Sequence, residues 1–180
     1  MQAELSVLFV DVRGFTELSE RLPAPELVAR LNRFYELATQ AVLAFDGTLD
    51  KMVGDQVMAF FGPPFRPKDH PRRAVRAALD IVASVGSMDA DGEGFRVGAG
   101  IGTGEAFVGN VGEEGVRDFT AIGDVVNTAA RLQGEAKPGE VLIMETTYLP
   151  VAADFPDAPQ RSLTLKGKSE PVPVRVLNAR

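Results

Sequence analysis

The segment FRVGAGIGTGEAFVGNVG, residues 95–112, decides which kind of sheet this chain builds. Its side chains alternate with a period of two, which is typical of a β-strand, with Val97, Ala99 and Ile101 on one face and Gly98, Gly100 and Gly102 on the other. A dinucleotide-binding loop would open a helix directly after its glycines, whereas EAFVGNV continues as strand. The pattern therefore favours a plain strand, and its bare glycine face predicts that another element packs closely against the sheet.

Elements on both sides of this strand alternate between the two periods. LSVLFVD predicts a buried strand that ends near Asp11, and residues 24–45 carry apolar side chains at a spacing of three or four, which indicates one long helix. GTLDKMVGDQVMAFFG predicts two strands joined at a tight turn at Gly54 and Asp55, and PRRAVRAALDIVASV predicts a second helix. GDVVNTAARL opens a third helix, followed by the strand GEVLIM, the short helix ETTYLPVAAD and two strands in RSLTLKGKSEPVPVRVL. This interleaving favours an α+β sheet with its helices on one side.

Composition limits the class of protein and its partners. With 180 residues, 45% hydrophobic and 24% charged, we expect residues 1–180 to form a single soluble domain. A net charge of -6 argues against nucleic acid and against an anionic membrane as partners. No apolar run is long enough to cross a bilayer and no cleavable leader precedes the first strand, so we expect a cytoplasmic module excised from a longer protein.

Metal chemistry is restricted by the residue types that are present. The chain has no cysteine and one histidine, His70, so a thiolate site or a zinc site with several histidines is excluded within one chain. Any metal must be a hard ion held by oxygen. His70, within KDHPRR, is predicted to be a loop residue and not a catalyst.

Three groups of polar residues are candidates for a site, although each has a structural explanation. Asp11 in FVDVRGFT and Asp55 in DKMVGDQVMAFFG occupy a strand end and a turn, where aspartate is common. Asn127 and Arg131 are four residues apart and share one side of a helix, which they would also do on a solvated face, with Arg131 paired to Glu135. The lysines of LKGK, Lys166 and Lys168, would ordinarily be solvated charges beside a turn.

Taken together, FVDVRGFT, DKMVGDQVMAFFG, DFTAIGDVVNTAARL and LKGK occur in the order found in a known family. From about residue 5 to residue 177, the chain resembles the catalytic domain of the class III nucleotidyl cyclases, the adenylate and guanylate cyclases. The resemblance implies a ferredoxin-like βαββαβ core with extra strands and helices. It also implies a head-to-tail dimer that binds ATP or GTP between its subunits.

The resemblance assigns roles to five of these residues. Asp11 and Asp55 match the two metal-binding carboxylates, and two Mg²⁺ or Mn²⁺ ions would lower the pKa of the ribose 3′ hydroxyl for in-line attack on phosphorus. Asn127 and Arg131 match the amide that orients the ribose and the guanidinium that meets charge on the α-phosphate, both lent by the opposite subunit. Lys166 matches a lysine that contacts the terminal phosphates.

Lys51 and Thr120 fall where the family reads the purine edge. Lys51 can only donate, to N1 of adenine, and the Thr120 hydroxyl can accept from the adenine amine, so the pair favours ATP. Many adenylate cyclases have aspartate at the position of Thr120, and a hydroxyl also donates, so we expect incomplete discrimination against GTP. The threonine variant resembles a bacterial and soluble-type subgroup in which bicarbonate or carbon dioxide sensitivity is reported.

The sequence therefore predicts an adenylate cyclase domain that forms cyclic AMP and pyrophosphate. Since every expected site residue is present in one chain, it also predicts a homodimer with two equivalent sites. The alternatives are a guanylate or dual-specificity cyclase and a nucleotide-binding dimerisation module without turnover. Regulatory domains of a parent protein, and their input, are not specified by these residues.

Overall fold

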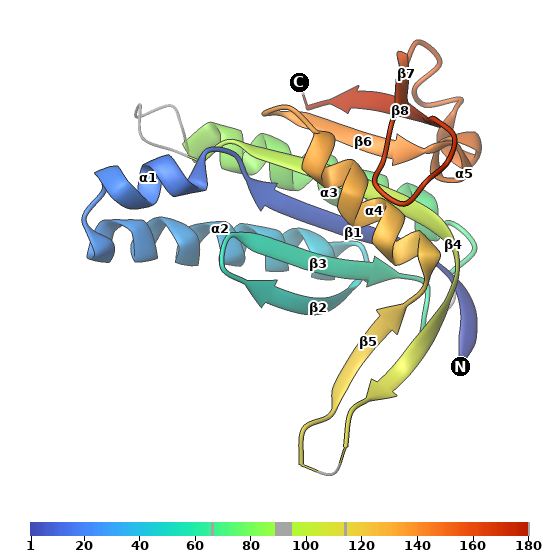
Figure 1. Ribbon diagram of the computed structural model, residues 1–180, viewed down its shortest axis with the longest axis horizontal. Coiled ribbons are helices and arrows are strands. Elements are labelled where there is room, and N and C mark those ends of the chain that lie inside the picture. The colour runs from blue at the N-terminus through green and yellow to red at the C-terminus, as the bar shows by residue number, and fades with distance from the viewer. Residues whose placement is uncertain (66, 89–94, 114, 180) are drawn as a thin grey trace.

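A computed structural model describes residues 1–65, 67–88, 95–113 and 115–179 of the chain. Within these residues the chain forms eight strands, five α-helices and one 3₁₀ helix (Figure 1). Their bounds in chain order are β1 Gln2–Val12, α1 Phe15–Arg21, α2 Ala24–Ala44, β2 Thr48–Val53, β3 Gln56–Phe61, α3 His70–Ser87, β4 Val97–Val111, β5 Asp118–Ile122, α4 Asp124–Glu135, β6 Glu140–Met144, α5 Glu145–Tyr148, η2 Leu149–Val151, β7 Gln160–Leu163 and β8 Val172–Asn178.

The segment from Gln2 to Val111 builds the predicted ferredoxin-like core. The elements β1, α2, β2, β3, α3 and β4 follow the order βαββαβ, and their strands lie in the order β2-β3-β1-β4, all antiparallel. The sheet continues beyond β4 through β6, β8 and β7, with β6 parallel to β4. The α+β prediction is confirmed, as are the extra strands.

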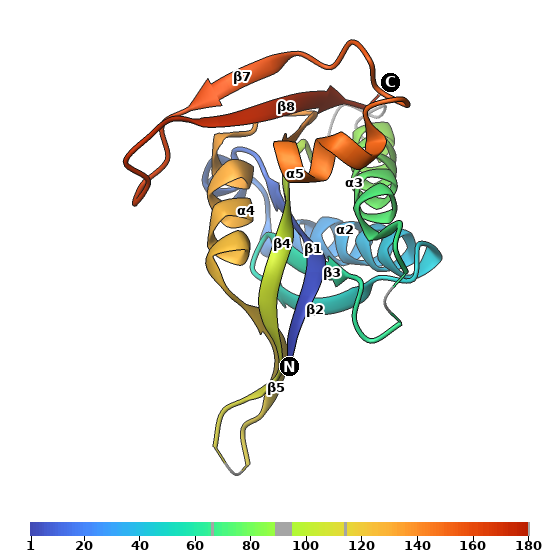
Figure 2. The same cartoon turned by 90° about the vertical axis from the view of Figure 1, so that its right-hand side faces the viewer.

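Helices cover both faces of the sheet, so the prediction that they lie on one side is wrong. Leu8 and Val10 of β1 face α2 and α3 in one buried cluster, whereas Val7 and Phe9 face Val125 and its neighbours on α4 in another. Figure 2 shows α4 on the side of the sheet opposite α2 and α3. The amphipathic pattern of a helix specifies that one stripe is buried, but not which face of the sheet buries it.

The glycine face of β4 is the surface on which α4 lies. A Cβ atom added to Gly100 would lie 2.4 Å from the backbone nitrogen of Gln133 and 2.5 Å from the carbonyl oxygen of Ala129. A Cβ atom added to Gly98 would lie 3.0 Å from the Cβ of Ala136, directly after α4, and one added to Gly102 would lie 3.0 Å from the carbonyl oxygen of Val125. The predicted close packing on the bare glycines is confirmed, and it sets the height of α4 above the sheet.

Two elements, α1 and β5, had no counterpart in the sequence prediction. The short helix α1 follows β1 after Gly14, whose positive φ of 69° is readily adopted by glycine. The far end of β4 and its partner β5 extend as an arm away from the rest of the sheet (Figures 1 and 2). None of the described helices is long and apolar enough to span a membrane.

Candidate active site

Asp11 and Asp55 are brought together by the pairing of β1 with β3. Asp11 is opposite Gln56 in the antiparallel register, so the turn residue Asp55 lies beside the end of β1. The Val12 amide donates to the Asp55 carbonyl at 3.2 Å, which holds the turn against the strand. Gly54 in the same turn has φ 60°, a conformation that favours glycine. The two predicted acids therefore form one cluster, far apart in sequence but adjacent in the sheet.

The electrostatics of this acid cluster fit a hard cation. Burial, and next the neighbouring Asp55 carboxyl, raise the pKa of Asp11 to about 7, although the Arg13 guanidinium opposes the shift. The Asp11 Oδ1 atom is buried and has no hydrogen-bond partner among the described residues. Two adjacent carboxyls, one with an unsatisfied buried oxygen, offer oxygen ligands whose negative charge a divalent cation such as Mg²⁺ or Mn²⁺ would neutralise.

The protein supplies few further ligands around the two acids. In the described part of the chain, no three acidic, histidine or cysteine side chains gather into a possible metal centre. Arg13, the cation beside Asp11, donates to the Gln133 carbonyl at 3.0 Å and supplies no ligand oxygen from its side chain. Any ion bound between Asp11 and Asp55 would therefore need additional oxygen ligands from water, backbone or a bound nucleotide.

Lys51 and Thr120, which are 69 residues apart, are in direct contact. The Lys51 ammonium donates to the Thr120 hydroxyl at 3.1 Å and to the Asp50 carboxylate at 2.8 Å, and the Thr120 hydroxyl donates to the other Asp50 oxygen at 2.6 Å. Sequence reasoning missed Asp50. The DK pair itself was the available signal, because an acid beside a substrate-reading lysine is positioned to bind it.

A β-bulge explains how neighbouring residues of β2 reach the same partner. Leu49 pairs with Ala59 and Lys51 pairs with Met58, so Asp50 is an extra residue in the register. In a regular strand, Lys51 would share the face of Leu49, which packs toward α2 and α3. The bulge turns Lys51 to the opposite face, where Met58 and α4 lie.

Asn127 and Arg131 lie on α4, four residues apart. Asn127 is exposed and Arg131 is half-buried. The Arg131 guanidinium lies against Gly167, where an added Cβ would be 3.3 Å from Nη1. Among the residues that the structure describes, Arg131 pairs neither with Glu135 nor with another acid. Its charge is therefore available to a ligand.

The LKGK turn between β7 and β8 lies along the same side of α4. Lys168 donates to the Asp124 carboxylate at 2.7 Å and is thereby engaged in the fold. Lys166 is exposed and forms no ion pair with a described residue. The structure thus distinguishes the two lysines, because Lys168 is engaged in an ion pair with a described residue and Lys166 is not.

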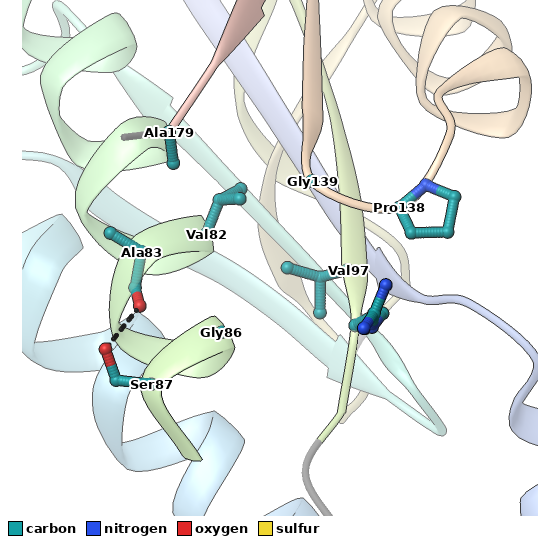
Figure 3. A pocket seen from close by; sticks show the side chains of 9 residues that line it. Val82, Ala83, Gly86, Ser87, Val97, Pro138, Gly139 and Ala179 are labelled. Carbon is teal, nitrogen blue, oxygen red and sulfur yellow. Dashed lines mark hydrogen bonds between the residues drawn. The ribbon is translucent and has the colours of Figure 1, made fainter. Parts of the chain in front are cut away.

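The predicted residues form separate groups within one chain. The acids contact each other, Lys51 contacts Thr120, and Arg131 contacts the turn that carries Lys166. A pocket of about 400 Å³ between α3 and the start of β4, lined by residues that include Val82, Val97 and Ala179, contains none of them (Figure 3). A second pocket of about 720 Å³ beside Phe155 contains none of them either.

His70 is a buried structural residue, and its prediction as a loop residue is wrong. It is the first residue of α3, and its Nδ1 is 2.8 Å from the Ser6 hydroxyl, which in turn is 2.7 Å from that of Thr103. Burial lowers the pKa of His70. The Pro-rich surroundings predicted a break in the chain but did not reveal this buried contact with β1.

Comparisons with known proteins identify the family of this chain. Residues 1–176 match the family described as the adenylate and guanylate cyclase catalytic domain. The chain is 35% identical over 139 residues to adenylate cyclase 1 of Rhizobium meliloti (strain 1021), covering 74% of this chain and 21% of that protein. The chain therefore spans about a fifth of the length of this relative.

Solved structures of both substrate classes share the fold. The adenylyl cyclase CyaB from P. aeruginosa is 35% identical with a TM-score of 0.87, over 100% of this chain and 96% of that one. The guanylyl cyclase Cya2 is 27% identical with a TM-score of 0.89, over 100% of this chain and 94% of that one. This chain belongs to the family of class III adenylate and guanylate cyclase catalytic domains.

Proposed function

We propose that this domain is an adenylate cyclase that converts ATP into 3′,5′-cyclic AMP and pyrophosphate. The observation that carries the choice of ATP is the contact of Lys51 with Thr120 at 3.1 Å. A lysine that only donates, beside a hydroxyl that accepts, complements the N1 acceptor and the amine donor of adenine. Related solved structures include both adenylyl and guanylyl cyclases, so this pair carries the distinction.

Asp11 and Asp55 hold the metal ions in this proposal. Two divalent cations, Mg²⁺ or Mn²⁺, would lower the pKa of the ribose 3′ hydroxyl and offset the charge of the triphosphate. The buried and unpaired Oδ1 of Asp11 supports this role, because such an oxygen otherwise lacks compensation.

The other site residues bind and orient the nucleotide. Arg131 meets charge that builds on the α-phosphate, and it has no acid partner in the described chain that would compete. Asn127 orients the ribose, and Lys166 contacts the terminal phosphates. Removing a donor of this kind typically lowers the rate by about a hundredfold or more.

A second copy of the chain completes the site. The arm formed by β4 and β5 exposes large apolar side chains, which suits an interface. Phe107, Val111 and Ile122 share one face of the arm, Phe119 lies on the other, and Val116 lies between the two strands in sequence. Arg131 lies against the turn that carries Lys166 and pairs with neither acid among the described residues, which supports composite sites in a head-to-tail homodimer. Residues 1–180 would then act as one catalytic domain of a longer protein.

The substrate is tested by comparing products from ATP and from GTP under identical Mg²⁺ or Mn²⁺ concentrations. Cyclic AMP as the main product supports the proposal. Equal or greater formation of cyclic GMP would favour the guanylate or dual-specificity alternative. The absence of pyrophosphate with either nucleotide, at protein concentrations where dimers are shown, would favour a binding module without turnover.

Composite sites are tested by mixing two inactive variants, Asp11→Ala and Arg131→Ala. A mixed dimer holds one site with both defects and one intact site, so activity should return. At equal mixing, random exchange places half the chains in mixed dimers, and the recovered activity is about a quarter of wild type. No recovery, with mixed dimers shown to form, would contradict the proposal.

A further inference from the structure

We infer that Asp50 sets the donor and acceptor pattern that Lys51 and Thr120 present to the purine base. This inference rests on the proposed function, since it deepens the roles of those two residues. Asp50 acts through Thr120, and is therefore a positioning residue that determines specificity.

Asp50 is held in a fixed and nearly buried position. Its side chain is 1% exposed, compared with 40% for Lys51. Both of its oxygens are engaged, one by Lys51 at 2.8 Å and the other by Thr120 at 2.6 Å. A buried carboxylate is costly without partners, so the hydrogen bonds from Lys51 and Thr120 stabilise Asp50 in one position, and the bulge places Asp50 within their reach.

The cluster formed by Asp50, Lys51 and Thr120 borders a small hollow on the α4 face of the sheet. This hollow, of about 70 Å³, is lined by Phe9, Lys51, Val53, Gln56 and Met58. The hollow is smaller than a purine and does not enclose one, but it places the apolar side chains of Phe9, Val53 and Met58 beside the Lys51 ammonium, where a flat heterocycle could lie against them. Lys51 links the hollow directly to Asp50.

The protons of the cluster can be assigned because a carboxylate only accepts. Thr120 has one hydroxyl proton, and it donates this proton in its hydrogen bond to Asp50. Lys51 has three protons, of which one goes to Asp50 and one to Thr120. Lys51 therefore keeps one donor for the base, and Thr120 keeps only acceptor capacity.

This assignment removes the ambiguity of a hydroxyl as a reader of purines. A free hydroxyl could donate to O6 of guanine as readily as it accepts from the amine of adenine. With its proton committed to Asp50, the Thr120 oxygen would meet O6 as acceptor against acceptor. A desolvated acceptor without a donor disfavours the wrong base by about tenfold or more.

The variant Asp50→Asn tests this assignment with little change of shape. Since Lys51 can only donate, the amide oxygen of the new side chain faces it, and the amide nitrogen faces Thr120. Thr120 then accepts from the amide, and its own proton becomes free to donate to O6. We expect the preference for ATP over GTP to fall by about tenfold.

A matched control is Asp118→Asn, which removes another acid near the same lysine. Asp118 lies 3.7 Å from the Lys51 ammonium and is 68% exposed, and it forms no hydrogen bond with Thr120. We expect this variant to keep the wild-type preference. An equal loss of preference in both variants would show that charge near Lys51, and not the Thr120 proton, is responsible.

The readout is the ratio of affinities for nonhydrolysable ATP and GTP analogues, measured by calorimetry with Mg²⁺ or Mn²⁺, alongside kcat/KM for both nucleotides. Affinities separate this inference from the proposed function. If the wild type forms no cyclic nucleotide but binds the ATP analogue more tightly, and Asp50→Asn loses that binding preference, the proposed activity is refuted and the inference about Asp50 stands. A wild type with no binding preference overturns the inference.

A second variant, Thr120→Val, distinguishes positioning from a merely structural role. If Asp50 acts through the hydroxyl, Asp50→Asn changes the ratio in the wild type but not in the Thr120→Val background. An unchanged ratio in either single variant, or equal effects of Asp50→Asn in both backgrounds, would overturn the inference. Should Asp50→Asn fail to fold, Thr120→Val alone must still lower the ATP preference.

Discussion

Gly100 is the point where α4 approaches the sheet most tightly, and Gly100→Ala tests whether that approach holds the helix in place. The new Cβ would lie 2.4 Å from the Gln133 nitrogen, 2.5 Å from the Ala129 oxygen and 2.9 Å from the Gln133 Cα. All three are backbone atoms of α4, so a change of rotamer cannot relieve the contact. The helix or the strand must move by about 1 Å to restore ordinary contact distances of about 3.5 Å.

The magnitude follows from the kind of atoms involved. Overpacking a well-packed core typically costs about 1–3 kcal/mol, and a backbone obstruction on two sides belongs at the upper end. We therefore expect Gly100→Ala to lower the free energy of unfolding by about 3 kcal/mol. For a chain of this size, each kcal/mol shifts Tm by about 2–4 °C, so Tm should fall by about 6–12 °C.

Gly104→Ala is the matched control on the same strand and the same face. Its new Cβ would lie 3.5 Å from Cγ2 of Val125, which is ordinary contact with a side chain. This variant should be neutral or more stable by about 0.4–1 kcal/mol, because alanine restricts the unfolded chain. Urea unfolding of both variants measures the difference, and cyclase activity well below Tm reports any displacement of Arg131. Equal stability of the two variants would refute the reasoning that backbone contact fixes α4.

Three further predictions concern single charged or titratable groups. In the absence of metal, the raised pKa of Asp11 means that this group's contribution to folded-state stability is complete below about pH 4 and is lost as the pH rises through about 7. Asp11→Asn should therefore raise Tm at pH 8 and not at pH 4, as measured by thermal unfolding in EDTA. Lys166→Ala should raise KM for ATP severalfold while Lys168→Ala, which removes only an exposed ion pair, should alter KM little; steady-state kinetics showing the reverse would exchange their roles. The lowered pKa of His70 means that the folded state favours the neutral imidazole, so the contribution of His70 to stability is present above about pH 6.5 and is lost on acidification. His70→Ala should therefore cost about 1–3 kcal/mol at pH 8, by leaving the Ser6 hydroxyl with one partner fewer, and less at pH 5; a pH-independent cost in urea unfolding would contradict this.

Most of the fold was predictable from local patterns. The period-two alternation of residues 95–112 predicted β4, and the glycines on one face predicted the close packing of another element, which the structure shows to be α4. The side of the sheet taken by α4 was not predictable, because an apolar stripe is equally suited to either face. His70 was misassigned for a similar reason, since its buried partner Ser6 lies 64 residues away.

The candidate site was predictable in its residue types but not in its contacts. Asp11, Asp55, Lys51 and Thr120 follow from motifs, and their roles stay predictions until they are tested. Asp50 did not emerge, because a polar residue in an edge strand is ordinary. Its importance depends on a bulge, which exists only as a mismatch between β2 and β3.

By itself, the sequence determined the order of strands and helices apart from α1 and β5, and the chemical groups available to a site, because periodicity and side-chain chemistry are properties of the chain alone. It also excluded thiolate metal sites, since cysteine is absent. Only the tertiary structure decided which groups meet: the two acids across β1 and β3, and Lys51, Asp50 and Thr120 across β2 and β5. The physical reason is that strand register and the face buried by each helix are set by partners distant in sequence, and a shift of one residue turns every side chain to the other face.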